Sequence, residues 1–157
     1  MYYLDRPLLE RKLSFLVGLG EQAKQLAGLM SATTNTNVTS ATDNSTPITY
    51  GLAQERLLHL AMEAVTDSGH MLIDAFMMRD AGSYEDIINI LFEEKVFAAE
   101  VHAVLLELVR MKSELVKEYE TRLTGLHPIL LRLADVFSAY DQTVRKFTAN
   151  EMRNIGQ

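Results

Sequence analysis

The sequence predicts an all-α protein, a bundle of four long helices and one short helix. Apolar residues recur at helical spacing along each long segment, and no run shows the alternation of apolar and polar residues that indicates a strand. The chain has 157 residues, of which 48% are hydrophobic. This length is enough for one domain with a buried core and too short for two ordinary domains. We therefore expect residues 1–157 to form a single helical domain.

The first helix is expected over residues 5–30. Asp5 occupies the position of an N-cap, and Pro7 is tolerated in the first turn of a helix. The apolar positions of this segment are Leu8, Leu9, Leu13, Phe15, Leu16, Leu19, Leu26 and Met30. Residues 31–49 consist mostly of Ser, Thr, Asn and Ala and have little to bury, so we expect a flexible polar loop there.

Residues 52–79 predict the central helix of the bundle. The segment is apolar around most of its circumference, which is typical of a helix buried among others. Its polar residues fall within one sector of roughly 80°. This polar stripe consists of Arg56, His59, Glu63, Asp67, His70 and Asp74. The stripe must meet a partner helix, a second subunit, a ligand or water in a cleft.

Three further helices complete the prediction. Ser83 followed by Asp86 resembles a capping box at the start of a short helix that runs through Leu91. A long amphipathic helix is expected from about residue 98 to Gly125. Pro128 is expected to open the last helix. The inner face of that helix comprises Leu130, Leu133, Val136, Phe137, Tyr140, Val144 and Phe147.

The composition narrows the possible chemistry. The chain has no cysteine, which excludes disulfides and thiol catalysis. Its net charge of −6 argues against broad electrostatic capture of duplex nucleic acid, although a local basic patch is still able to bind RNA. The sequence shows no secretion signal and no window of 18 apolar residues, so we expect a cytoplasmic protein outside the membrane. Glycine-rich phosphate-binding loops are absent, which argues against nucleotide hydrolysis.

The polar stripe supports two interpretations. Asp67 and His70 are three residues apart on one helix face, a spacing used by metal sites in helical bundles. A two-metal centre needs this motif on two helices, and the chain offers it once, so we expect neither a metal nor another cofactor. The residues alone favour an ion-paired strip that fixes the register of the central helix.

A second candidate site lies in the long helix, around Lys112 and Lys117. Lys112 and Tyr119 are seven residues apart and are expected to share a face, whereas Ser113 and Lys117, four apart, share the next face. Two lysines, a serine and a tyrosine around one helical turn are able to hold a phosphate. Such a mixed surface is also typical of a solvated helix face.

Several of these segments together resemble the HepT-like family of the HEPN superfamily, and within it the YutE-like branch of Firmicutes. The most specific run is residues 74–87, and the resemblance spans nearly all of the chain except residues 31–49 and the last helix. The matching segments are MYYLDR at 1–6, the spacing of Arg56, His59, Glu63 and Asp67, DAFMMRDAGSYEDI at 74–87 and LVKEY at 115–119.

The resemblance implies a helical homodimer in which a ribonuclease motif from each subunit meets at the interface. In toxin members of toxin-antitoxin pairs, the motif contains Arg, a polar residue, His and Tyr, and a nucleotidyltransferase antitoxin modifies the tyrosine with AMP. The alignment implies that Lys112 stands at the Arg position, Ser113 at the polar position and Lys117 at the His position. Tyr119 is the one motif residue retained.

These departures weaken the expected chemistry. Metal-independent RNA cleavage needs a group that exchanges protons near neutral pH, which imidazole does and an ordinary lysine, with a pKa of about 10.4, does poorly. Arg110 lies two residues before the aligned position and would substitute only if the local register shifts. His59 or His70 would supply an imidazole if either reached Lys112.

Three hypotheses follow. The first is that the protein is a toxin-type ribonuclease with a degenerate motif and weak or no activity. The second is that it is a binding module for RNA, a nucleotide or a nucleotidyltransferase. The third is that it is a structural homodimer whose polar stripe sets register. An active form would be a metal-independent endoribonuclease.

Overall fold

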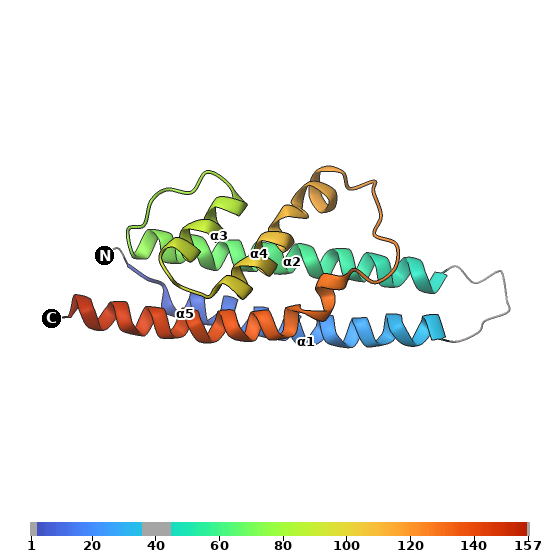
Figure 1. Ribbon diagram of the computed structural model, residues 1–157, viewed down its shortest axis with the longest axis horizontal. Helices are drawn as coiled ribbons and strands as arrows, with labels where there is room; N and C mark the ends of the chain where they lie inside the picture. Colours follow the sequence, from blue (N-terminus) through green and yellow to red (C-terminus); the bar gives the residue numbers. More distant parts are fainter. Residues whose placement is uncertain (1–2, 36–44, 157) are drawn as a thin grey trace.

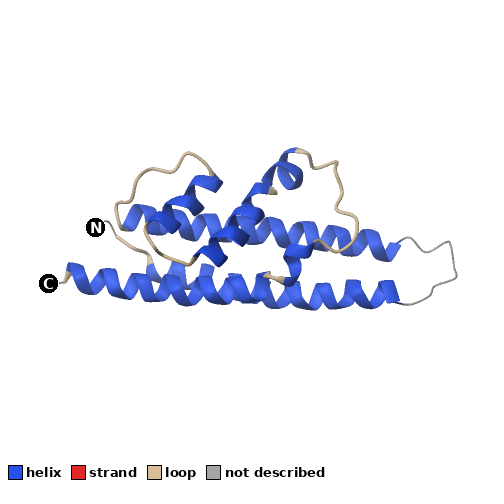
Figure 2. Cartoon of the chain, viewed as in Figure 1, coloured by secondary structure: helices blue, strands red, loops and turns tan. Residues whose placement is uncertain are grey.

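The computed structural model describes residues 3–35 and 45–156, and all of the regular secondary structure in these ranges is helical (Figures 1 and 2). The all-α prediction is therefore confirmed for the described residues. The helices are α1 (Arg6–Asn35), α2 (Ser45–Ala75), α3 (Tyr84–Glu93), α4 (Ala99–Arg110) and α5 (Leu133–Ile155), with a π-helical turn at Ser113–Lys117 and a 3-10 turn at Pro128–Leu131.

The three longest helices form the body of the molecule. Helix α1 packs along both α2 and α5, while α3 and α4 pack against each other over α2 (Figure 1). The core contains side chains from all of these elements, and many of them are completely shielded from water. Its largest fully buried side chains include Tyr140, Phe137, Leu13, Leu16, Leu58 and Met62.

Helix α1 begins as the sequence predicts. A carboxylate oxygen of Asp5 accepts a hydrogen bond from the backbone N–H of Leu8 at 3.0 Å, the bond expected of an N-cap. The helix ends five residues later than predicted, at Asn35. Phe15 does not join the core that the apolar spacing suggested, because its side chain lies on the outer face of α1 and is 46% exposed.

Both ends of the expected loop at residues 31–49 are helical. Helix α1 continues through residue 35 and α2 begins at Ser45, so the loop prediction is wrong at both ends. The rest of the predicted loop, residues 36–44, lies outside the described residues. Local composition predicted a loop because these turns carry few apolar residues, but they extend two helices whose packing is already set by the core.

Helix α2 contains the helix predicted over residues 52–79 but ends at Ala75 rather than Arg79, and α1 rather than α2 lies between the other two long helices. The chain turns at Met77, which has a positive φ of 54°, and the N–H of Met78 donates to the carbonyl of Ile73 at 3.0 Å. This six-to-one bond is characteristic of a Schellman termination. Further along, Ser83 caps α3 by accepting a hydrogen bond from the N–H of Asp86 at 3.1 Å, which confirms the predicted cap.

The prediction of one long helix over residues 98–125 is wrong in its second half. Helix α4 ends at Arg110, and no α-helix continues through residues 118–127. Two neighbouring side chains of α2 hold this loop instead. Buried Gln54 donates to the carbonyl of Gly125 and accepts from the N–H of His127, at 3.0 and 2.7 Å, while Glu55 accepts from the N–H of Leu123 at 2.8 Å. These bonds satisfy backbone groups that a helix would otherwise pair.

The last helix follows the predicted pattern with a shifted start. Pro128 opens a 3-10 turn, and α5 itself begins at Leu133. All of the predicted inner residues are buried except Phe147, which is partly buried. No helix in the described part of the chain is long and apolar enough to cross a membrane.

Candidate functional site

An open cleft of about 580 Å³ lies between α2, the start of α3 and the end of α4. We call it the His70 cleft. The side chains that give it its charge and chemistry are His70, Tyr84, Glu85, Arg110, Lys112 and Lys117. Three of these carry a permanent positive charge and one a negative charge, so the cleft is locally cationic on a chain whose net charge is −6.

The π-helical turn explains how Lys112 and Lys117 come to line one cleft. In a regular α-helix, residues five positions apart point about 140° away from each other. Here the N–H of Glu118 donates to the carbonyl of Ser113, five residues earlier, at 2.8 Å. This bonding widens the turn and brings Lys117 back toward the side of Lys112. Tyr119 lies beyond this turn, so the regular helix on which its predicted shared face with Lys112 depends is not present.

Ser113 and Tyr119 lie outside the cleft. The hydroxyl of Ser113 donates to the carboxylate of Glu118 at 3.4 Å, and the side chain is exposed. Tyr119 lies beyond the π-helical turn and is 72% exposed. Of the four aligned motif positions, the structure brings the two lysines to the cleft and leaves the serine and the tyrosine at the surface around it.

His70 is the stripe histidine that lies at the cleft. It projects from α2 and is exposed, and it lines the cleft together with Lys112 and Lys117. His59 lies farther along α2, where its ring contacts Arg56 at 3.4 Å and Glu63 at 3.8 Å. The sequence left the choice between these two histidines open, and in the structure His70 lines the cleft whereas His59 does not.

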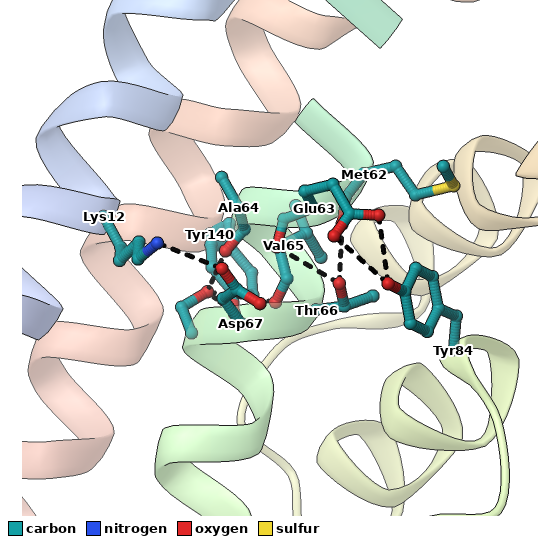
Figure 3. A network of polar contacts seen from close by, with 10 residues as sticks. Lys12, Met62, Glu63, Ala64, Val65, Thr66, Asp67, Tyr84 and Tyr140 are labelled. Atoms are coloured by element: carbon teal, nitrogen blue, oxygen red, sulfur yellow. Dashed lines mark hydrogen bonds and ion pairs between the residues drawn. The ribbon is translucent and has the colours of Figure 1, made fainter. Parts of the chain in front are cut away.

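Tyr84 connects the polar stripe of α2 to Lys112. Its hydroxyl donates to both carboxylate oxygens of Glu63, at 3.0 and 3.1 Å (Figure 3). The ammonium of Lys112 lies 3.7 Å from the centroid of the Tyr84 ring, within the range of a cation–π interaction. Burial, followed by the hydrogen bond to Glu63, raises the pKa of the Tyr84 hydroxyl, so it remains a protonated donor at neutral pH.

Arg110 and Glu85 form an ion pair within the cleft. The Nη2 and Nε atoms of Arg110 donate to the same Glu85 oxygen, at 2.6 and 3.1 Å. The hydrogen bond from Arg110 lowers the pKa of the Glu85 carboxyl, which keeps this carboxylate charged at neutral pH. The pair thus places a guanidinium beside the two lysines.

The remaining stripe residues are at the surface rather than sealed in the core. Asp67 is exposed and accepts a hydrogen bond from the ammonium of Lys12 on α1 at 3.0 Å (Figure 3). Arg56 and Asp74 are exposed as well. The stripe therefore makes an ion pair with α1 and polar contacts along α2, but it lies at the surface rather than inside the bundle, and His70 also lines the cleft. Among the described residues, no group of three His, Asp or Glu side chains is placed to hold a metal ion.

Sequence reasoning missed Tyr84 and Glu85 as site residues. Both lie in the first turn of α3. The contact that places them is the packing of α3 against Gly69 of α2, where a Cβ would lie only 2.6 Å from a methyl group of Ile87. The only sequence signal was that both residues fall within the distinctive run at 74–87.

Comparisons with known proteins find the same family that the sequence resembles. The family model described as Ribonuclease HepT-like matches residues 23–121. The Bacillus subtilis (strain 168) protein named "Putative RNase YutE" is 31% identical over 153 residues, which span 97% of this chain and 95% of that protein. A solved structure of YutE from Bacillus subtilis, described as a cytosolic protein of unknown function, matches with a TM-score of 0.65 and 27% identity, covering 96% of this chain and 95% of the other.

Proposed function

The chain belongs to the ribonuclease HepT-like family, and from this premise we propose that it is a toxin-type protein that binds single-stranded RNA in the His70 cleft. Its ribonuclease motif is degenerate and its cleavage activity is weak. The observation that carries the proposal is that His70 lines the same cleft as the two lysines at the motif positions, Lys112 and Lys117.

The cleft contains the groups for metal-independent cleavage. In that reaction the 2′-hydroxyl of RNA loses its proton and attacks the adjacent phosphorus, and the departing 5′ oxygen gains a proton. The bond between phosphorus and the 5′ oxygen breaks, which leaves a 2′,3′-cyclic phosphate and a 5′-hydroxyl. His70 would carry one of these protons, because imidazole titrates near neutral pH. Lys112 and Lys117 would stabilise the charge on the phosphate oxygens.

The same geometry accounts for weak activity. The chain has four histidines, and His70 alone among them lines the cleft. One imidazole serves one of the two proton transfers well, and lysine is a poor donor or acceptor for the other near neutral pH. Binding is less affected, because a lysine retains the positive charge that attracts a phosphate.

The proposal includes the assembly that family membership suggests. We infer a cytoplasmic homodimer that encounters a nucleotidyltransferase antitoxin. In support, Tyr119 is 72% exposed, so an enzyme that transfers AMP to a tyrosine would have access to its hydroxyl. The competing function is a non-enzymatic homodimer whose polar stripe sets register, and the bond from Lys12 to Asp67, which joins α1 to the stripe within one chain, supports the register role.

Cleavage of a labelled single-stranded RNA in the presence of a chelator tests the proposal. The wild-type protein should cut slowly, and His70→Ala should lower the rate by about 100-fold or more. The variant Lys112→Ala with Lys117→Ala should also weaken binding, measured by fluorescence anisotropy. His59→Ala is the matched control, because it removes a histidine from the same helix outside the cleft and should leave the rate unchanged.

Two results would contradict the proposal. Equal losses in His59→Ala and His70→Ala would show that the imidazole in the cleft has no particular role. A wild-type protein that neither cuts nor binds RNA, at concentrations well above any contaminant, would favour the non-enzymatic homodimer.

A further inference from the structure

Arg110 is held in the His70 cleft by a weak and incomplete ion pair. Both of its bonds to Glu85 reach a single carboxylate oxygen, and the side chains are 59% and 44% exposed. Exposed pairs of this kind contribute little because water and salt compete for both partners. Among the described residues, the Nη1 atom of Arg110 has no hydrogen-bond acceptor, so part of the guanidinium stays available.

The position of Arg110 favours contact with the same phosphate-bearing ligand as the lysines. It is the last residue of α4, immediately before the change of helical geometry that turns Lys112 and Lys117 into the cleft. Guanidinium groups bind phosphate oxygens through two parallel hydrogen bonds, whereas an ammonium acts as a point charge. In this cleft the Arg110 guanidinium is suited to orienting a phosphate, and the Lys112 and Lys117 ammonium groups are suited to attracting it.

We propose that Arg110 is a phosphate-binding residue of the His70 cleft and that Glu85 occupies its guanidinium until an RNA phosphate displaces the carboxylate. The inference rests on the proposed RNA-binding function and adds a specific exchange of partners to it. Glu85 then affects RNA binding through Arg110. Removing the charge of Glu85 strengthens RNA binding only while Arg110 is present.

The test measures the dissociation constant of a fluorescein-labelled single-stranded RNA by anisotropy at several salt concentrations. Arg110→Gln should raise the constant by about tenfold, as expected for loss of a charge-assisted hydrogen bond. It should also reduce the slope of log K against log salt by about 0.7, the value for one phosphate contact on a single strand. Glu85→Gln should lower the constant by about threefold.

The molecule provides a matched control in a second exposed ion pair, between Glu107 of α4 and Arg132 at the start of α5. Arg132 donates to Glu107 at 2.7 Å, with side chains 44% and 41% exposed, and neither residue lines the cleft. Glu107→Gln changes the net charge by the same amount as Glu85→Gln and frees an arginine in the same way. It should therefore alter RNA binding less than Glu85→Gln does.

The double variant Arg110→Gln with Glu85→Gln decides between exchange and simple repulsion. If Glu85 acts through Arg110, the double variant should bind RNA as weakly as Arg110→Gln alone. If Glu85→Gln strengthens binding equally with and without Arg110, the carboxylate merely repels phosphate and the proposal is wrong. Unchanged binding by Arg110→Gln, in a protein whose binding needs Lys112 and Lys117, would overturn it as well.

A titration with inorganic phosphate separates this inference from the proposed function. The NMR signal of the Arg110 side-chain Nε–H should shift as phosphate replaces Glu85, and it should shift at lower phosphate concentration in Glu85→Gln. This shift in a protein that binds no RNA would support the anion site and reject the RNA function. Absence of the shift would overturn the assignment of Arg110.

Discussion

Replacing Tyr84 tests whether the polar stripe of α2 serves the His70 cleft or only joins helices. Tyr84→Phe removes the hydroxyl that bonds both oxygens of Glu63 at 3.0 and 3.1 Å and keeps the ring below Lys112. A hydrogen bond to a charged group contributes about 1.5–3 kcal/mol, and partial exposure here favours the lower end. We expect the free energy of unfolding to fall by about 1.5 kcal/mol, with RNA binding changed less than twofold.

Tyr84→Leu removes the ring as well. Its contact with the Lys112 ammonium, at 3.7 Å from the centroid, contributes about 0.5–1 kcal/mol at an exposed site. Without the ring, Lys112 loses the contact that holds it at the cleft. We therefore expect Tyr84→Leu to raise the dissociation constant for RNA by about two- to fivefold, the range that corresponds to this contact.

Two assays on the same preparations separate these effects. Urea denaturation followed by circular dichroism measures stability, and fluorescence anisotropy measures binding of a labelled single-stranded RNA. Combining each substitution with Lys112→Ala completes a double-mutant cycle. If Tyr84→Leu binds RNA as tightly as Tyr84→Phe, or if its effect persists unchanged without Lys112, then the ring does not position the lysine and our reasoning is refuted.

Two further predictions concern the fold and its pH dependence. Gly20→Ala should lower the free energy of unfolding by about 1–3 kcal/mol, because its Cβ would lie 2.9 Å from the Cα of Ala134 in the α5 backbone. Gly18→Ala, with nothing within 4 Å, should raise it by about 0.5–1 kcal/mol in the same urea titration. Burial raises the pKa of Tyr140 to about 12, above the value of about 10 in an unfolded chain. The stability from keeping Tyr140 neutral is therefore complete below pH 10 and lost toward pH 12, an effect of about 2–3 kcal/mol. Tyr140→Phe should lack this loss, and an equal loss in that variant would assign it to other groups.

The sequence predicted those features of the fold that depend on local chemistry. Asp5 and Ser83 were identified as caps because their side chains bond backbone groups within three residues. The end of α4 was not predictable in this way, since apolar residues continue at helical spacing beyond it. The loop that replaces the second half of the predicted helix is held by tertiary contacts, because Gln54 and Glu55 of α2 bond its backbone groups about 70 residues away in the chain.

The candidate site was predicted as two separate halves. The polar stripe and the lysine pair were each visible as patterns, but periodicity says nothing about which faces of two helices meet. Their meeting depends on Gly69, which lets α3 approach α2 so closely that a Cβ would lie 2.6 Å from Ile87. This approach brings Tyr84 to Glu63. His70, which follows Gly69 in α2, then lies beside the cleft.

The π-helical turn lets Lys112 and Lys117 line the same cleft. In a regular α-helix Lys112 and Lys117 would diverge by about 140°. The five-residue bond from Glu118 to Ser113 removes that divergence, and it begins directly after the α-helical turn that presents Arg110. Arg110, Lys112 and Lys117 thus line one cleft, and His70 of α2 lines it with them. If the proposed function holds, phosphate binding depends on the geometry of this turn as well as on the identity of its residues.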